Sequence, residues 1–92
     1  MAGPKFPLGQ VVATPGALEA LAAAGVAPDE YLGRHVTGDW GTLTEDDREE
    51  NELSLREGLR ILSPYILPDQ TKIWIITEAD RSATTILLPE EY

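Results

Sequence analysis

The stretch WIITEADRSATTILLP, residues 74–89, places two runs rich in β-branched residues on either side of a short polar segment. Such runs are typical of β-strands, and the Ala-Asp-Arg-Ser segment at 79–82 is typical of a turn between them. A third run of the same kind precedes them and is separated from them by residues 68–71. Short turns join neighbouring antiparallel strands, so the sequence predicts a meander over residues 60–67, 72–78 and 83–88.

The first half of the chain has the signals of helices. Thr14 can cap a helix with its hydroxyl, and Pro15 suits the first helical position, where a backbone N–H would be unpaired anyway. Gly25 is typical of a helix end. We expect two further helices, over residues 28–36 and 44–58, from the same kinds of signal.

With a short extended segment at residues 10–14, the element order becomes β-α-α-α-β-β-β. We therefore predict an α+β fold, a single domain over residues 1–92 whose helices cover one face of a three-stranded or four-stranded antiparallel sheet. Residues 1–8 are expected to form a flexible or strand-covering arm.

Composition limits the classes of function. The net charge is -9, which disfavours general binding to nucleic acid because that binding depends on Lys and Arg. The chain has no cysteine, no apolar run long enough to span a membrane and no signal-peptide pattern, so we expect a soluble, cytoplasmic protein.

Acidic residues are concentrated in the third predicted helix, where we interpret them as a solvated face: Glu45, Asp46, Asp47, Glu49, Glu50, Glu52 and Glu57. Their spacing lacks the glycine and alternating acids of an EF-hand. One histidine and no cysteine make a zinc site improbable. We therefore predict no metal site and no cofactor.

Tight turns would set the pairing of the strands. We expect Ile66 to face Ile73, and Ile75 to face Ile86. The face toward the helices would then carry Leu62, Pro64, Ile66, Ile73, Ile75, Ile86 and Leu88. The outer face would carry Ile61, Ser63, Tyr65, Trp74, Ile76, Thr85 and Leu87.

That outer face is more apolar than water-exposed sheets usually are. On it Tyr65 would lie opposite Trp74, with Ile76 and Leu87 alongside, so we predict a partner-binding surface there. Three kinds of contact could cover this outer face: the N-terminal segment with Phe6, a second subunit in a symmetric dimer, or a different protein.

Polar side chains gather at one end of the predicted core face, where two guanidinium groups and nearby hydroxyls could bind an anion. The candidates are Arg60, Arg81, Ser82, Thr77 and Thr84. The alternative is an ordinary hydrogen-bonded turn in which Asp80 bonds to the backbone.

His35 is the only histidine. An imidazole that titrates near neutral pH suits acid–base catalysis, and Arg34 and Asp39 lie close in sequence. The alternative is a histidine that the last carbonyls of a helix attract.

Much of the chain from Val11 to Tyr92 resembles a family of small uncharacterised bacterial proteins associated with plasmids and integrated elements. The resemblance rests on the segments ATPGA at 13–17, RH at 34–35, GDWG at 38–41, NEL at 51–53, SPY at 63–65 and residues 74–92. This resemblance implies membership of a mobile element but no particular activity.

The layout is also similar to metal-independent ribonuclease toxins of the barnase, EndoU, colicin and RelE grouping. That similarity implies that His35 is the acid–base group and that Arg60 and Arg81 stabilise charge on a phosphate. It also implies that Ser63, Tyr65 and Thr84 position the substrate. The predicted pairing separates Ser63 and Tyr65 from the other groups, and the acidic charge opposes RNA binding.

Two hypotheses follow, and the sequence leaves open whether the protein is an enzyme. The first is an accessory protein of a mobile element, a self-associating regulatory module that binds a protein through the outer sheet face or the acidic helix. The second is a ribonuclease-like domain built on His35, Arg60 and Arg81. A third idea is that the acidic helix mimics nucleic acid.

Overall fold

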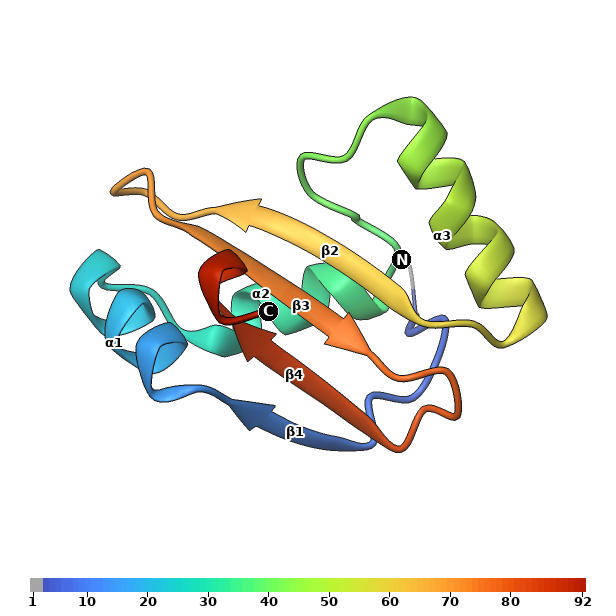
Figure 1. Cartoon of the computed structure of the whole chain (residues 1–92), viewed down its shortest axis with the longest axis horizontal. Coiled ribbons are helices and arrows are strands. Elements are labelled where there is room, and N and C mark those ends of the chain that lie inside the picture. The colour runs from blue at the N-terminus through green and yellow to red at the C-terminus, as the bar shows by residue number, and fades with distance from the viewer. Residues whose placement is uncertain (1–2) are drawn as a thin grey trace.

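A computed structural model of the chain describes residues 3–92, and its helices and strands follow the predicted order (Figure 1). The α+β fold class is therefore confirmed. The elements are β1 (Gln10–Ala13), α1 (Pro15–Ala24), α2 (Pro28–Val36), α3 (Glu45–Glu57), β2 (Ile61–Ile66), β3 (Lys72–Thr77), β4 (Ala83–Leu87) and the 3-10 turn η1 (Pro89–Glu91).

The four strands form one sheet in the order β1-β4-β3-β2. The antiparallel meander predicted for the last three strands is present. The first strand, however, pairs in parallel with the last, so the sheet is mixed rather than purely antiparallel. A parallel neighbour needs a long crossover, which the three helices and β2 and β3 supply here.

The helix ends follow the sequence signals. The Thr14 side chain accepts a hydrogen bond from the backbone N–H of Ala17, and Gly25 ends α1 in the left-handed conformation. Thr44 caps α3 in the same way, through the backbone N–H of Asp47. These local signals are reliable because a cap needs only residues near it in sequence.

The register of β2 against β3 differs from the prediction by one residue. Ile66 pairs with Lys72 rather than with Ile73, which leaves a loop of residues 67–71 between the strands. The prediction assumed an even loop length, whereas the loop is odd and closes through Gln70 at a φ of 75°. The β3–β4 register is as predicted, with Ile75 paired to Ile86.

A shift of one residue moves every side chain of β2 to the other face. Ser63 and Tyr65 are therefore buried on the helix-covered face, where the prediction put Pro64 and Ile66. Ile66 is instead exposed on the outer face. The predicted faces of β3 and β4 are correct.

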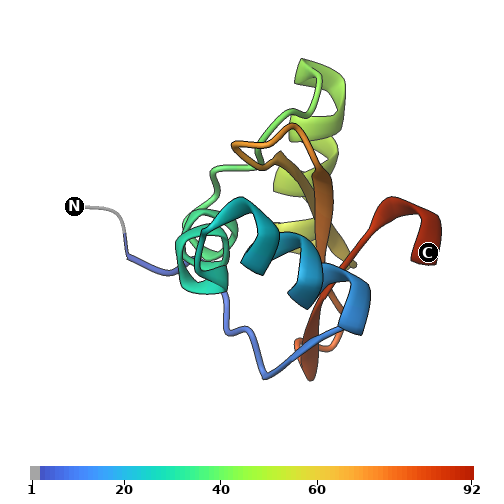
Figure 2. The same ribbon diagram turned by 90° about the vertical axis from the view of Figure 1, so that its left-hand side faces the viewer.

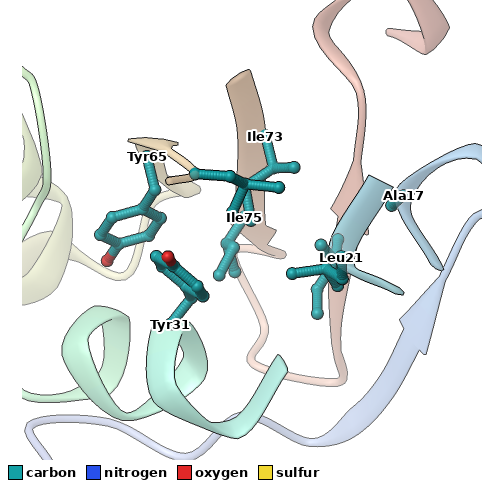
Figure 3. Packing of buried hydrophobic residues seen from close by; sticks show 8 residues of the cluster. Ala17, Leu21, Tyr31, Tyr65, Ile73 and Ile75 are labelled. Atoms are coloured by element: carbon teal, nitrogen blue, oxygen red, sulfur yellow. The ribbon is translucent and has the colours of Figure 1, made fainter. Parts of the chain in front are cut away.

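Two groups of buried side chains form the core. The larger joins α1 and α2 to the sheet, and Figure 3 shows Tyr31 and Leu21 approaching Tyr65, Ile73 and Ile75. The smaller contains Phe6, Trp40 and Ile61, with Leu43 and Leu55 packed against it. Phe6 belongs to the N-terminal arm, so the described part of this arm lies on the helix-covered side of the sheet. Residues 1 and 2 of the arm lie outside the described part of the chain.

The two edges of the sheet differ. At the β2 edge, the Asn51 amide donates to the carbonyl of Leu62 (2.7 Å) and accepts from its N–H (3.4 Å). The backbone N–H of Thr42 donates to the carbonyl of Pro64 (3.1 Å). Gly41 permits this approach, because a Cβ there would overlap the Pro64 carbonyl. The edge at β1 has no further strand beside it within residues 3–92.

The chain after β4 turns onto the outer face, opposite α1 and α2 (Figure 2). There the ring of Tyr92 lies 5.6 Å from that of Trp74, edge to face. No helix within residues 3–92 combines the length and apolar character needed to cross a bilayer.

Candidate functional site

His35 ends up inside the protein and not at its surface. The last turn of α2 directs its ring between the helix and the sheet, where none of the residue is exposed. Its Nδ1 lies 2.5 Å from Ser63 Oγ and its Nε2 lies 2.8 Å from Thr77 Oγ1. Both ring nitrogens are therefore satisfied by hydroxyls of β2 and β3.

The hydroxyl chain continues to the N-terminal arm. Thr77 Oγ1 lies 2.8 Å from Thr84 Oγ1, which donates to the carbonyl of Leu8 (2.7 Å). That carbonyl can only accept, so the Thr84 proton is committed to it and Thr77 must donate to Thr84. His35 then donates to Thr77 through Nε2–H, and its Nδ1 accepts from Ser63.

The buried surroundings of the ring favour a neutral imidazole. Burial, together with the positive charge of Arg81, lowers the pKa of His35 to about 4. The predicted acid–base role would need contact with a substrate, and the ring has no exposed surface. The alternative prediction was that the last carbonyls of a helix attract His35. The hydrogen-bond partners of His35 are instead the Ser63 and Thr77 side chains of the sheet.

Arg81 is held by the protein itself. Its guanidinium donates to the carbonyls of Leu59 (2.6 Å), Glu78 (3.1 Å) and Ser54 (3.1 Å), and it lies over the ring of Phe6. The residue has a φ of 60°, which places it in the left-handed region within the turn. Arg81 thus ties the β3–β4 turn to the end of α3.

Arg60 makes different contacts. It donates to the Tyr92 hydroxyl (2.6 Å) and lies 3.6 Å from a carboxylate oxygen of Glu78. Thr77 and Thr84 are buried in the hydroxyl chain, whereas Ser82 is exposed at the turn. The five predicted anion-binding residues therefore do not converge on one accessible point.

The 79–82 segment has the hydrogen bonds of a turn. The backbone N–H of Ser82 donates to the Asp80 carboxylate (3.0 Å), and the hydrogen bonds from Ser82 lower the pKa of Asp80. The N–H of Arg81 donates to the Glu78 carbonyl (2.9 Å). These contacts match the alternative interpretation of the sequence, an ordinary hydrogen-bonded turn.

The predicted outer-face patch is only partly formed. Trp74, Ile76 and Leu87 do lie on that face, but Tyr65 lies on the other, so the Tyr65–Trp74 pair is wrong. The Tyr65 hydroxyl donates to the carbonyl of Asp39 (2.7 Å), and burial raises the pKa of Tyr65 to about 12. Ile76 and Leu87 are buried within the chain itself.

The segment that packs on this face is the C-terminal one, which is none of the three predicted covers. Tyr92 packs on Trp74, whereas Phe6 lies on the opposite side of the sheet. The N-terminal segment therefore does not cross the outer face. The aromatic residue at position 92 lies beyond the last predicted strand, so the strand periodicity did not indicate its position.

The surface of α3 is the remaining candidate. A hollow of about 310 Å³ lies between α3 and β2, lined by Leu43, Asp47, Glu50, Asn51, Ser54, Arg60 and Leu62. A second hollow of about 470 Å³ lies along the same helix and is lined by Asp46, Asp47, Glu49, Glu50, Leu53 and Arg56. Asp47 and Glu50 border both, and each hollow also contains leucine side chains.

The charges of this helix are not neutralised by other elements. Within residues 3–92 the ion pairs join Arg34 to Asp39 and Arg60 to Glu78, and neither involves α3. Of its acids, Glu52 accepts a hydrogen bond from the indole of Trp40 (3.0 Å). The described residues contain no group of His and acidic side chains that could hold a metal ion.

No family model, no curated protein and no solved structure matches this chain.

Proposed function

We propose that this protein is a protein-binding module without catalytic activity, and that it uses the surface of α3 to hold a cationic, partly apolar segment of another protein. The observation that carries the proposal is the pair of hollows that share Asp47 and Glu50. Carboxylates above leucine side chains suit a segment in which Lys or Arg alternates with aliphatic residues.

Catalysis has less support from the same geometry. His35 is enclosed and Arg81 is occupied by backbone carbonyls, so neither is free to meet a phosphate. The net charge of -9 repels a nucleic-acid backbone and attracts a cationic peptide. The resemblance to plasmid-associated proteins would make the partner a protein of a mobile element.

The experiment is a titration of the protein into a fluorescent peptide of alternating Lys and Leu, followed by anisotropy. We expect saturable binding that weakens with salt, and no binding of a Glu–Leu peptide of equal length. The double variant Asp47→Asn/Glu50→Gln should weaken binding about tenfold or more.

A matched control separates the site from the overall charge. Glu19→Gln/Glu90→Gln makes the same change in net charge at two exposed positions outside α3, and should leave the affinity within about twofold. An equal loss in both double variants, or no binding by the unmodified protein, would overturn the proposal.

A further inference from the structure

Within residues 3–92 the two edges of the sheet differ in how much of their backbone is already hydrogen-bonded. At the β2 edge, Asn51 and Thr42 already satisfy the outward groups of Leu62 and Pro64. Pro64 in addition has no N–H to offer to another strand. Among the described residues, no strand lies beyond β1, while Gln10, Val11 and Val12 are exposed and the strand contains no proline.

The outward groups of β1 follow from its pairing. The N–H groups of Gln10 and Thr14 donate to Ser82 and Ile86, on the β4 side. Because the direction of backbone groups alternates along a strand, the N–H and C=O of Val11 and Ala13 point away from the sheet. They are placed to bond to an added strand.

The side chains around this edge are mostly apolar and almost all uncharged. Val11 is 44% exposed and Val12 is 42% exposed, one on each face of the sheet, and Leu18 on the adjacent α1 is 52% exposed. Residues 9–28 contain a single charged side chain, Glu19, in a protein whose net charge is -9. Two copies that approach through this edge avoid the repulsion that α3 would cause.

We infer that β1 binds β1 of a second copy, antiparallel and about a two-fold axis, to join the two sheets into one. With Val12 opposite its own counterpart, Val11 of each copy pairs with Ala13 of the other. In that register every outward N–H meets an outward C=O. The interface is symmetric because each copy offers the same edge, and the β2 edge is already occupied at Leu62 and Pro64. This inference does not depend on the proposed function of α3.

The test is the mass in solution, measured by sedimentation equilibrium from micromolar to millimolar concentration. We expect a dimer, and a rise of about tenfold or more in its Kd in Val11→Pro, which removes an outward N–H but no bond to β4. Val11→Ala keeps that N–H and serves as the control. A monomer at all concentrations, or a Val11→Pro dimer of unchanged Kd, would overturn the inference.

A charge pair provides a second test that does not depend on tolerance of proline. Val12→Glu and Val12→Lys should each be monomeric, because the two-fold axis brings like charges together. An equimolar mixture of the two should form the mixed dimer. Failure of the mixture to associate, while the unmodified protein dimerises, would show that the dimer uses another surface.

Discussion

His35 lies where the charged form of its ring is disfavoured. Burial removes the water that would solvate a charge, and the positive charge of Arg81 opposes a second one, so the pKa of His35 lies well below physiological pH. The histidine therefore links α2 to β2 and β3 as a structural residue. Thr84 extends the link to the N-terminal arm at Leu8.

This environment makes stability depend on pH. The pKa of His35 is about 4 when folded and near 6.5 when unfolded, so the unfolded chain binds more protons between these values and stability falls as pH drops below about 6.5. We expect His35 to remove about 2 kcal/mol from the free energy of unfolding between pH 7 and pH 5. Urea denaturation at both pH values measures this.

The control for this prediction is His35→Gln, which cannot titrate and should lose less stability over the same range. Because the chain has one histidine, its ring resonance also gives the pKa directly by NMR. A measured pKa near 6.5 in the folded protein would contradict the account.

At the scale of elements, the sequence predicted the ends of helices better than it predicted the pairing of strands. Thr14, Gly25 and Thr44 mark helix ends through contacts with their own neighbours, and all three were placed correctly. The β2 register depended on the conformation of Gln70, a non-glycine residue at positive φ that no sequence rule indicates. That one error moved Ser63 to the wrong face and so hid its contact with His35.

The candidate site shows the same division. The acidic character of α3 is plain in the sequence, but the hollow beside it needs Leu43 and Leu62, which meet only in the folded chain. The role of Asn51 likewise depends on a contact with the β2 edge, far from it in sequence. The sequence patterns therefore did not predict which distant segments pair with each other.

Asn51 gives the prediction at this scale. Asn51→Ala would leave the N–H and C=O of Leu62 without partners beside a buried helix face, and we expect a loss of about 2 kcal/mol in the free energy of unfolding. Faster hydrogen exchange of the Leu62 amide should accompany it. Glu49→Ala, at an exposed position of the same helix, should change stability by less than about 0.5 kcal/mol.

At the scale of the whole molecule, charge is distributed unequally. The segment from residue 9 to residue 28 is almost uncharged, whereas acidic side chains are concentrated in α3. The two proposed surfaces therefore differ in chemistry: α3 would attract cations, and the β1 edge would avoid repulsion. Salt should weaken the binding of a cationic partner to α3 and strengthen the association of two copies through β1.

Self-repulsion predicts how the monomer responds to salt. With a net charge of -9, screening should raise the thermal midpoint as NaCl increases from about 20 mM to 500 mM, because the Debye length becomes shorter than the spacing of the acids. Calorimetry at a protein concentration below the Kd of the dimer measures the thermal midpoint of the monomer. Asp46→Lys/Glu49→Lys reduces the net negative charge and should show a smaller shift, and an equal or larger shift would contradict the explanation.

The parallel pairing of β1 with β4 has a consequence for synthesis of the protein. Residues 10–13 are synthesised about 70 residues before residues 83–86, a delay of about 4 to 14 s at ordinary translation rates. During that time the nascent chain presents a strand whose native partner does not yet exist. The sheet closes only when the last strand arrives, so folding of the first strand is necessarily a late event.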